Sequence, residues 1–210
     1  MNSETINLRR TLHQYPELSG CEVNTAQRIK DFILKHHPTD IIENVGRGTG
    51  LAVLYTFGDD GPTIAIRCEL DALPIDEPNE LNYRSIYPGI SHKCGHDGHM
   101  AIVAGLIFWL KEQSFKTGKV ILLFQPAEET GKGGEAVLKD EKFMALGPDF
   151  LFALHNIPDY PLHSIIAMDK GFSAEVQSLA IRLSGKESHA AEPENGINTT
   201  LAISEIIAAL

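Results

Sequence analysis

Apolar residues in the first 40 positions recur at helical spacing, in two groups separated by a break. Leu8, Leu12 and Tyr15 share one helical face, and Pro16 with the Ser-Gly pair after it predicts the end of that helix. A second apolar stripe consists of Ala26, Ile29, Phe32 and Ile33. The sequence therefore predicts two amphipathic helices at its start.

Short apolar runs without helical period follow. The runs 51–57 and 63–70 are separated by "GDDGP", a strong turn signal, so we expect a hairpin or adjacent strands. Residues 99–113 are apolar almost all round, as in a buried helix. Buried strands are expected at 119–125 and 149–155, with a short helix between them. Strands that alternate with helices predict a layered α/β domain with a largely parallel central sheet.

The pattern changes again near the C-terminal end of the sequence. Residues 175–185 alternate like a strand half exposed to solvent, and residues 197–210 predict a helix that continues to the last residue. A strand and a helix alone cannot bury a core. We therefore expect one large domain at 1–172 and the start of a second, incomplete domain at 173–210.

The charge balance and the cysteine count exclude several classes of protein. The chain has 18 Lys and Arg against 28 Asp and Glu, a formal net charge of -10, and no basic run. Such a chain is a poor candidate for binding nucleic acid or anionic membranes. It has no apolar signal core or membrane-spanning run, and its 3 scattered cysteines do not suit a disulfide scaffold. We expect a cytoplasmic protein with no nucleic-acid or membrane partner.

Side chains that bind metals or transfer protons gather where the predicted strands end. They are Glu69 and Asp71, then Cys94, His96, Asp97 and His99, then Glu128 and Glu129, and finally His155. In open α/β sheets, ligands bind at the carboxyl ends of the strands. We therefore expect these groups to lie close together.

The residue types narrow the chemistry of such a site. Cysteine, histidine and carboxylate together favour zinc, manganese, cobalt or nickel over calcium or magnesium. Adjacent side chains at a strand end point in different directions, so one of Glu128 and Glu129 can bind metal while the other accepts a proton from water. Hydrolysis of an amide requires this arrangement.

Plainer interpretations exist for each of these residues. Alone, Cys94 is an ordinary thiol, and His96 or His155 is a hydrogen-bonded side chain. The pair Glu128–Glu129 suits a helix N-terminus, where carboxylates are favoured. A third interpretation makes Cys94 a nucleophile with His155 or His96 as its base. It leaves the glutamate pair unexplained.

The remaining residues near these groups are expected to have structural roles. His99 falls in the first turn of the predicted buried helix, where packing is favoured over metal binding. Asp97 is expected to support the same loop and helix start. We expect His92 to be exposed and His13 to have no more than a surface or capping role.

Several stretches taken together resemble a known family. They are "CGHDGHMA", "LLFQPAEE", "ALHN" and "SGKESHAAEP", with "LRRTLHQYPELSG" and "RCELDALPI" before them. Over essentially its whole length the chain is similar to the metal-dependent amidohydrolases that include hippurate hydrolase, indole-acetyl-amino-acid hydrolases and N-acetyl-diaminopimelate deacetylase. These form a branch of the aminoacylase and carboxypeptidase G family.

The resemblance implies a catalytic α/β domain interrupted by a small α/β lid, which begins at 173 and forms a homodimer. It implies two divalent metal ions, with the ligands Cys94, His96, Glu129 and His155. It also implies Glu128 as general base, Asp71 as a residue that orients a ligand, and His189 as a donor to the oxyanion, often across the dimer. A further histidine ligand near the family's C-terminus is not in this chain.

The chain departs from the family pattern at a few positions. Glu69 replaces the usual first aspartate of "DMDAL", Glu187 and Ser188 replace two glycines, and Glu194 replaces a histidine. These changes concern the lid and substrate preference rather than the metal chemistry. We predict a metal-dependent amidohydrolase that acts on N-acyl amino acids or related conjugates. The alternative is a non-catalytic metal-binding fragment, because one ligand and most of the lid are missing.

Overall fold

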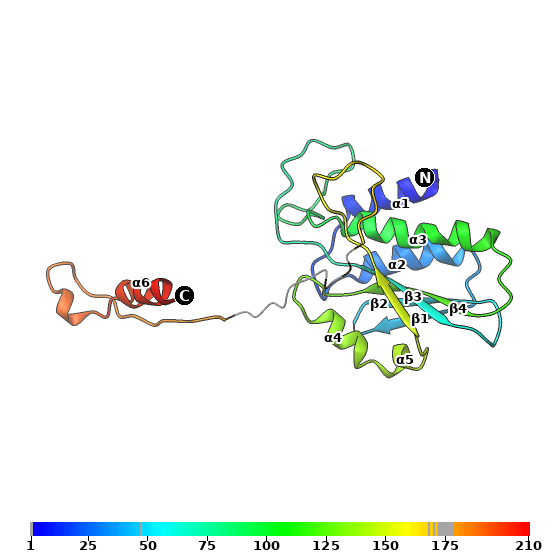
Figure 1. The fold of residues 1–210 in the computed structure, drawn as a ribbon. Helices are drawn as coiled ribbons and strands as arrows, with labels where there is room; N and C mark the ends of the chain where they lie inside the picture. Colours follow the sequence, from blue (N-terminus) through cyan, green and yellow to red (C-terminus); the bar gives the residue numbers. More distant parts are fainter. Residues whose placement is uncertain (1, 47, 168, 170, 172–178) are drawn as a thin grey trace. The chain divides into compact units, whose positions relative to one another are not determined.

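A computed structural model describes the protein at residues 2–46, 48–167, 169, 171 and 179–210 (Figure 1). The chain forms two compact units, Met1–Asp159 and Tyr160–Leu210. The predicted domain boundary between 172 and 173 lies outside the described residues.

A five-stranded sheet forms the centre of the first unit. Its strands are β1 (Asp40–Val45), β2 (Gly50–Thr56), β3 (Thr63–Glu69), β4 (Lys119–Gln125) and β5 (Phe150–Ala153). Their order across the sheet is β1-β2-β4-β3-β5. Strand β3 pairs in parallel with β4 and β5, whereas β2 pairs antiparallel with β1 and β4. The predicted α/β fold with a largely parallel sheet is confirmed, and β2 is the strand that runs the other way.

Helices cover both faces of this sheet (Figure 1). They are α1 (Ser3–Gln14), α2 (Val23–Leu34), α3 (His96–Glu112), α4 (Gly133–Leu138) and α5 (Glu141–Met144). On one face, Ile29 of α2 and Ile107 of α3 belong to the same buried cluster as Phe124 of β4. On the other face, Val137 of α4 and Phe143 of α5 form a second cluster with the sheet. Successive strand residues point to opposite faces, so covering both faces explains the almost continuous apolar runs.

Two expectations about the strands are wrong. Strands β2 and β3 do not form a hairpin and are not neighbours, because β4 lies between them. The turn signal acts only locally, whereas pairing depends on burial across the whole sheet. Strand β5 is not buried: Phe150, Leu151 and Phe152 are 56%, 54% and 57% exposed. It is the last strand of the described sheet and pairs with β3 alone.

The carboxyl ends of β3, β4 and β5 lie at the same end of the sheet. Glu69 is level with Gln125 across β3 and β4, and Arg67 is level with Ala153 across β3 and β5. The segments that follow these strands therefore begin close together. Helix α3 begins at the same place, since its first residue His96 contacts the segment directly after β3. This is the position where open α/β sheets bind ligands.

The second unit contains η1 (Pro193–Asn195) and α6 (Thr200–Ala209). The latter confirms the helix predicted within 197–210. The strand predicted at 175–185 lies partly outside the described residues, and residues 179–185 form no strand. A strand needs a neighbour for its backbone groups, and the bridge between Lys186 and Ile197 is isolated. Among all helices described in the chain, none is long and apolar enough to cross a membrane.

Candidate metal centre

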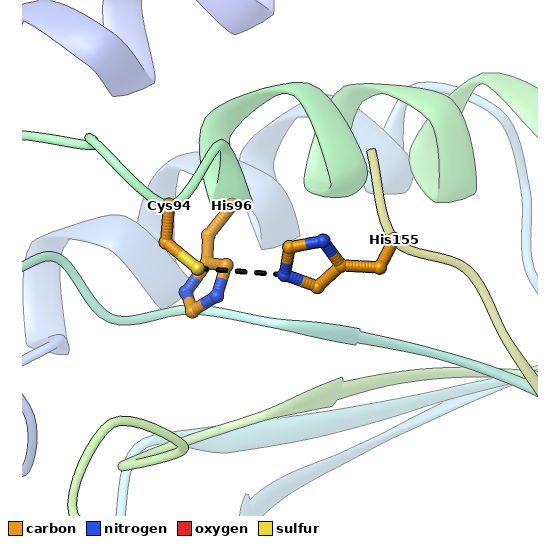
Figure 2. Close-up of side chains that lie close together, drawn as sticks. All are labelled: Cys94, His96 and His155. Atoms are coloured by element: carbon orange, nitrogen blue, oxygen red, sulfur yellow. Dashed lines mark hydrogen bonds between the residues drawn. The ribbon is translucent and has the colours of Figure 1, made fainter. Parts of the chain in front are cut away.

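Cys94, His96 and His155 lie together at the carboxyl ends of the parallel strands (Figure 2). Their ligand atoms are all within 4.8 Å of one another, and Sγ of Cys94 is 3.4 Å from Nε2 of His155. Ligand atoms in a tetrahedral zinc site, with zinc–sulfur and zinc–nitrogen distances of ~2.3 and ~2.1 Å, are about 3.5 Å apart. The thiol and the two imidazoles therefore have the spacing of a shared metal site.

Both imidazoles are oriented by backbone carbonyl groups. Nδ1 of His96 is 2.7 Å from the carbonyl oxygen of Asp71, and Nδ1 of His155 is 2.8 Å from that of Asn156. A carbonyl oxygen only accepts, so each Nδ1 carries the proton and each Nε2 keeps a lone pair. Histidines that bind metals through Nε2 are supported in this way.

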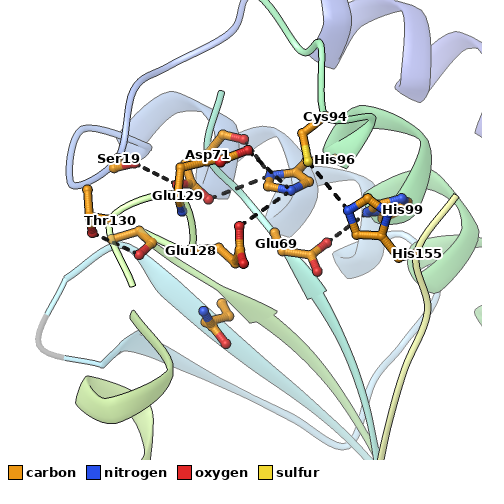
Figure 3. Close-up of polar contacts among 12 residues, drawn as sticks. Ser19, Glu69, Asp71, Cys94, His96, His99, Glu128, Glu129, Thr130 and His155 are labelled. Carbon is orange, nitrogen blue, oxygen red and sulfur yellow. Dashed lines mark hydrogen bonds and ion pairs between the residues drawn. The ribbon is translucent and has the colours of Figure 1, made fainter. Parts of the chain in front are cut away.

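The two glutamates contact His96 from the loop after β4 (Figure 3). Oε2 of Glu128 and Oε1 of Glu129 lie 3.8 Å and 3.7 Å from Nε2 of His96. The backbone N–H of Glu129 donates to Oδ2 of Asp71 at 2.9 Å, and the Ser19 hydroxyl donates to the same oxygen at 2.6 Å. Asp71 thus contacts His96 through its carbonyl group and Glu129 through its carboxylate.

Two buried ligand atoms at this position are unsatisfied. Within the described parts of the chain, neither Nε2 of His96 nor Oε1 of Glu129 has a hydrogen-bond partner. A buried polar atom without a partner costs roughly 1–3 kcal/mol. One cation would satisfy both atoms, since each has a free lone pair. The residues present therefore fit a divalent metal ion.

The site has a strongly negative electrostatic environment. Burial, followed by the charges of Glu129, Glu128 and Glu69, raises the pKa of the Cys94 thiol to about 12. Burial and the charge of Glu129 also raise the pKa of Glu128 above its usual value. A nucleophilic cysteine needs a lowered pKa, so these surroundings argue against Cys94 as nucleophile, although His155 is close. The same charges favour a bound cation.

His99, expected only to pack, extends the cluster. Its Nδ1 is 2.8 Å from Oε2 of Glu69, and its Nε2 is 2.6 Å from Oδ1 of Asn156. The His99 and His155 rings are 4.7 Å apart, and the ligand atoms of Glu69, His96 and His99 lie within 4.8 Å of one another. His99 therefore connects the end of β3 to the residue that follows His155.

Two other histidines contradict the sequence-based expectation. His92 is 4% exposed, and burial lowers its pKa to about 4. His13 is also buried, with Nδ1 3.0 Å from Oδ2 of Asp97 and Nε2 2.9 Å from Oε1 of Glu77. His13 is covered because the 70–95 loop packs against α1. Asp97 lies in the first turn of α3, where its carboxylate accepts from Arg9 Nε at 3.1 Å and lies against His13 of α1, and its support of the loop stays a prediction.

Sequence reasoning missed two residues that contact this region from the segment before α2. Ser19 donates to Asp71, and Glu22 accepts the backbone N–H of Ala127. The only signal for Ser19 is the resemblance of the stretch ending at Gly20 to a family motif, and Glu22 lies two residues beyond that stretch. Of the residues predicted for the site, all but His189 belong to the first unit, and His189 belongs to the second.

Comparisons with known proteins identify the family. Residues 65–203 match peptidase family M20/M25/M40. The chain is 40% identical over 211 residues to the N-acetyl-L-cysteine deacetylase of Bacillus subtilis strain 168, covering 100% of this chain and 50% of that protein. It is 35% identical over 208 residues to the N-acetyldiaminopimelate deacetylase of Priestia megaterium, covering 99% and 55%. The chain spans about half the length of these relatives.

A solved structure supports the same assignment. The crystal structure of the Bacillus subtilis YXEP protein, a dinuclear metal-binding peptidase from the M20 family, superposes with a TM-score of 0.69. The two are 37% identical, and the match covers 76% of this chain and 44% of that one. These findings confirm the family resemblance that the sequence motifs indicate. The chain therefore belongs to peptidase family M20/M25/M40.

Proposed function

We propose that the protein is a metal-dependent amidohydrolase that removes the acyl group from N-acyl amino acids. The observation that carries the proposal is the pair of unsatisfied atoms, Nε2 of His96 and Oε1 of Glu129, which lie 3.7 Å apart. Cys94 and His155 add a sulfur and a nitrogen ligand beside them, and Glu128 adds a second carboxylate. A metal site with a neighbouring free carboxylate suits hydrolysis.

The metal would be held by Cys94, His96, Glu129 and His155. Three groups of candidate ligand atoms in the described residues share His96: it lies with Cys94 and His155, with Glu128 and Glu129, and with Glu69 and His99. The first two groups, together with the dinuclear YXEP relative, support two ions. A bound divalent cation supplies a Lewis acid that polarises an amide carbonyl and acidifies water. The mixed sulfur, nitrogen and oxygen donors favour zinc, manganese, cobalt or nickel.

Glu128 would act as the general base. Its side chain is 39% exposed, against 21% for Glu129, so it is the more accessible to water and substrate. It would take a proton from the attacking water and deliver it to the leaving amine. Asp71 would hold His96 through its backbone carbonyl group and Glu129 through its carboxylate.

The second unit would complete the reaction centre. On the family resemblance, we propose that His189 donates a hydrogen bond to the oxyanion, across a homodimer formed through 173–210. The relatives, named as deacetylases of N-acetyl-L-cysteine and N-acetyldiaminopimelate, support N-acyl amino acids as the substrate class. Small cytoplasmic N-acetyl amino acids are therefore the first substrates to test.

The test is an assay of the full-length protein on a panel of N-acyl amino acids. We expect amine release that stops after chelation and returns when a divalent metal is restored. Activity that survives complete removal of metal would contradict the proposal. Alkylation of Cys94 that abolishes activity while the metal content stays unchanged would instead favour a cysteine nucleophile.

A further inference from the structure

We infer that Glu22 is a positioning residue for Glu128, an inference that rests on the proposed function. Glu22 directly precedes α2, and its exposed fraction is 0%. A carboxylate is stable in the interior only where hydrogen-bond donors replace the lost water. The identity of these donors indicates what Glu22 does.

Each carboxylate oxygen of Glu22 accepts a hydrogen bond from a different segment. The Ala127 N–H donates to Oε1 at 2.8 Å, and the Thr49 hydroxyl donates to Oε2 at 2.7 Å. Ala127 is the residue immediately before Glu128. Glu22 therefore holds the residue next to the proposed base, and neither of these two hydrogen bonds involves a proposed metal ligand.

Ala127 adopts a backbone conformation that alanine rarely takes. Its φ is 50°, in the left-handed region where a Cβ atom is unfavourable. Such a residue needs surrounding contacts to hold it. Besides the bond from its N–H to Glu22, its carbonyl oxygen accepts from the Thr130 hydroxyl at 3.0 Å and from the Gly133 N–H at 3.1 Å. Both peptide groups of Ala127 are thus fixed, and with them the direction of the Glu128 side chain.

The next peptide groups of the loop are also bonded. The Glu128 carbonyl oxygen accepts the Gly131 N–H at 2.8 Å, and the Glu129 N–H donates to Asp71 at 2.9 Å. Asp71 therefore orients the proposed metal-binding glutamate, and Glu22 orients the proposed base. A misplacement of about 1 Å can lower a rate about 100-fold. Glu22 thus influences proton transfer through the backbone.

The test compares substitutions at Glu22 in the metal-loaded, full-length protein. Glu22→Ala should lower kcat about 10- to 100-fold, with KM within about twofold and metal content unchanged. Glu22→Gln should retain kcat within about threefold, because its amide oxygen still accepts from Ala127, and its NH2 can donate to the Thr49 hydroxyl oxygen in place of the bond that this hydroxyl donates to Glu22. Hydrogen exchange over residues 126–132 should be faster in Glu22→Ala and unchanged in Glu22→Gln.

Glu17 offers a matched control in the same segment. Its carboxylate bonds Asn24 and Thr25 at the start of α2. Glu17→Ala should lower the Tm and leave kcat and the exchange of 126–132 unchanged. If Glu22→Ala does not fold, Glu22→Asp tests the inference in its place. Its side chain keeps the charge but is shorter, so it should lower kcat in the same way.

A full kcat in folded Glu22→Ala or Glu22→Asp overturns the inference, as does a rise in KM at constant kcat. Failure of the proposed function has a different signature. In that case the wild type releases no amine from any N-acyl amino acid, whereas Glu22→Ala still accelerates hydrogen exchange in the 126–132 loop.

Discussion

Nδ1 of His96 donates a hydrogen bond to the backbone carbonyl oxygen of Asp71 over 2.7 Å. The acceptor is a main-chain atom, and Oδ1 of the Asp71 carboxylate lies 3.7 Å from the same nitrogen. The other carboxylate oxygen, Oδ2, accepts from the Glu129 N–H and the Ser19 hydroxyl. One residue at the end of β3 thus supports a histidine and a glutamate through separate groups.

Metal binding should stabilise the protein. Zinc at about 100 times its Kd should raise the free energy of unfolding by about 2.7 kcal/mol, measured as a shift in thermal unfolding. His96→Ala should abolish most of that shift, because His96 belongs to every group of candidate ligand atoms in the described residues. His37→Asn, at an exposed position with φ 54°, is the control and should keep the full shift. An equal zinc shift in His96→Ala would contradict this assignment.

Asp71→Ala should be costly in two ways. It leaves the Glu129 N–H and the Ser19 hydroxyl without their acceptor, which should lower the free energy of unfolding by roughly 1–3 kcal/mol. It should also weaken metal binding about 10- to 100-fold, as loss of supporting partners does elsewhere. Urea denaturation and metal titration measure the two effects. Ser19→Ala, which removes one donor alone, should bind metal much more tightly than Asp71→Ala, and equal affinities would refute the role of the carboxylate.

Gly95→Ala should disturb the loop between Cys94 and α3. Gly95 has φ 95°, and a Cβ added there would lie 2.5 Å from Oδ1 of Asn156, whose backbone carbonyl orients His155. We expect a loss of about 1–3 kcal/mol in stability together with weaker metal binding. Gly89→Ala is the matched control, since Gly89 has φ 74° and nothing within 4 Å of such a Cβ. It should lose about 1 kcal/mol and bind metal normally.

The buried His13 predicts a pH dependence of stability. Its hydrogen bond to Asp97, followed by that to Glu77, outweighs burial and raises its pKa above 6.5. For Asp97 and Glu77, burial alone would raise the pKa, but hydrogen bonds that include those from His13 lower it below 3.8 and 4.5. The contribution of His13 to the free energy of unfolding is complete below pH 6.5 and is lost as pH rises through the pKa that His13 has in the folded protein. The contribution of the two carboxylates to the free energy of unfolding is present above their usual pKa values and is lost as pH falls through their pKa values in the folded protein.

The network of His13, Asp97 and Glu77 should therefore stabilise the fold most at a pH above the usual pKa values of the carboxylates and below that of the histidine, near pH 5–6. Chelator-treated wild type, unfolded by urea across pH 5 to 9, should lose stability on the alkaline side as His13 gives up its proton. His13→Gln cannot titrate and should show a flatter profile over that range. Parallel profiles for the two proteins would show that the network does not contribute in this way.

Much of the fold was predictable because helices and strands that bury one face carry apolar residues at regular spacing in the sequence. The apolar stripes correctly indicate α1, α2 and α3, and the apolar runs indicate β2, β3 and β4. Strand β1 was not predicted, since it is mostly exposed or partly exposed and lacks a clear alternation. The position of β4 between β2 and β3 depends on contacts between distant segments, which local turn chemistry does not encode.

The site was predictable to the extent that residue types and strand ends determine it. Cys94, His96 and His155 do lie together, and the glutamate pair joins them. The residues that hold these side chains in place were not predictable, because each acts through a contact between positions far apart in the sequence. The bond from Ala127 to Glu22, for example, spans 105 positions, and a lone glutamate before a helix looks like an ordinary surface residue.

The most direct test of the central claim is the rate of amine release by Glu128→Gln, measured with its metal content on the same sample. If Glu128 is the base of a metal-dependent hydrolase, kcat should fall roughly 10²–10⁴-fold, while the metal stoichiometry stays at the wild-type value. Wild-type turnover by Glu128→Gln with metal bound would contradict the account.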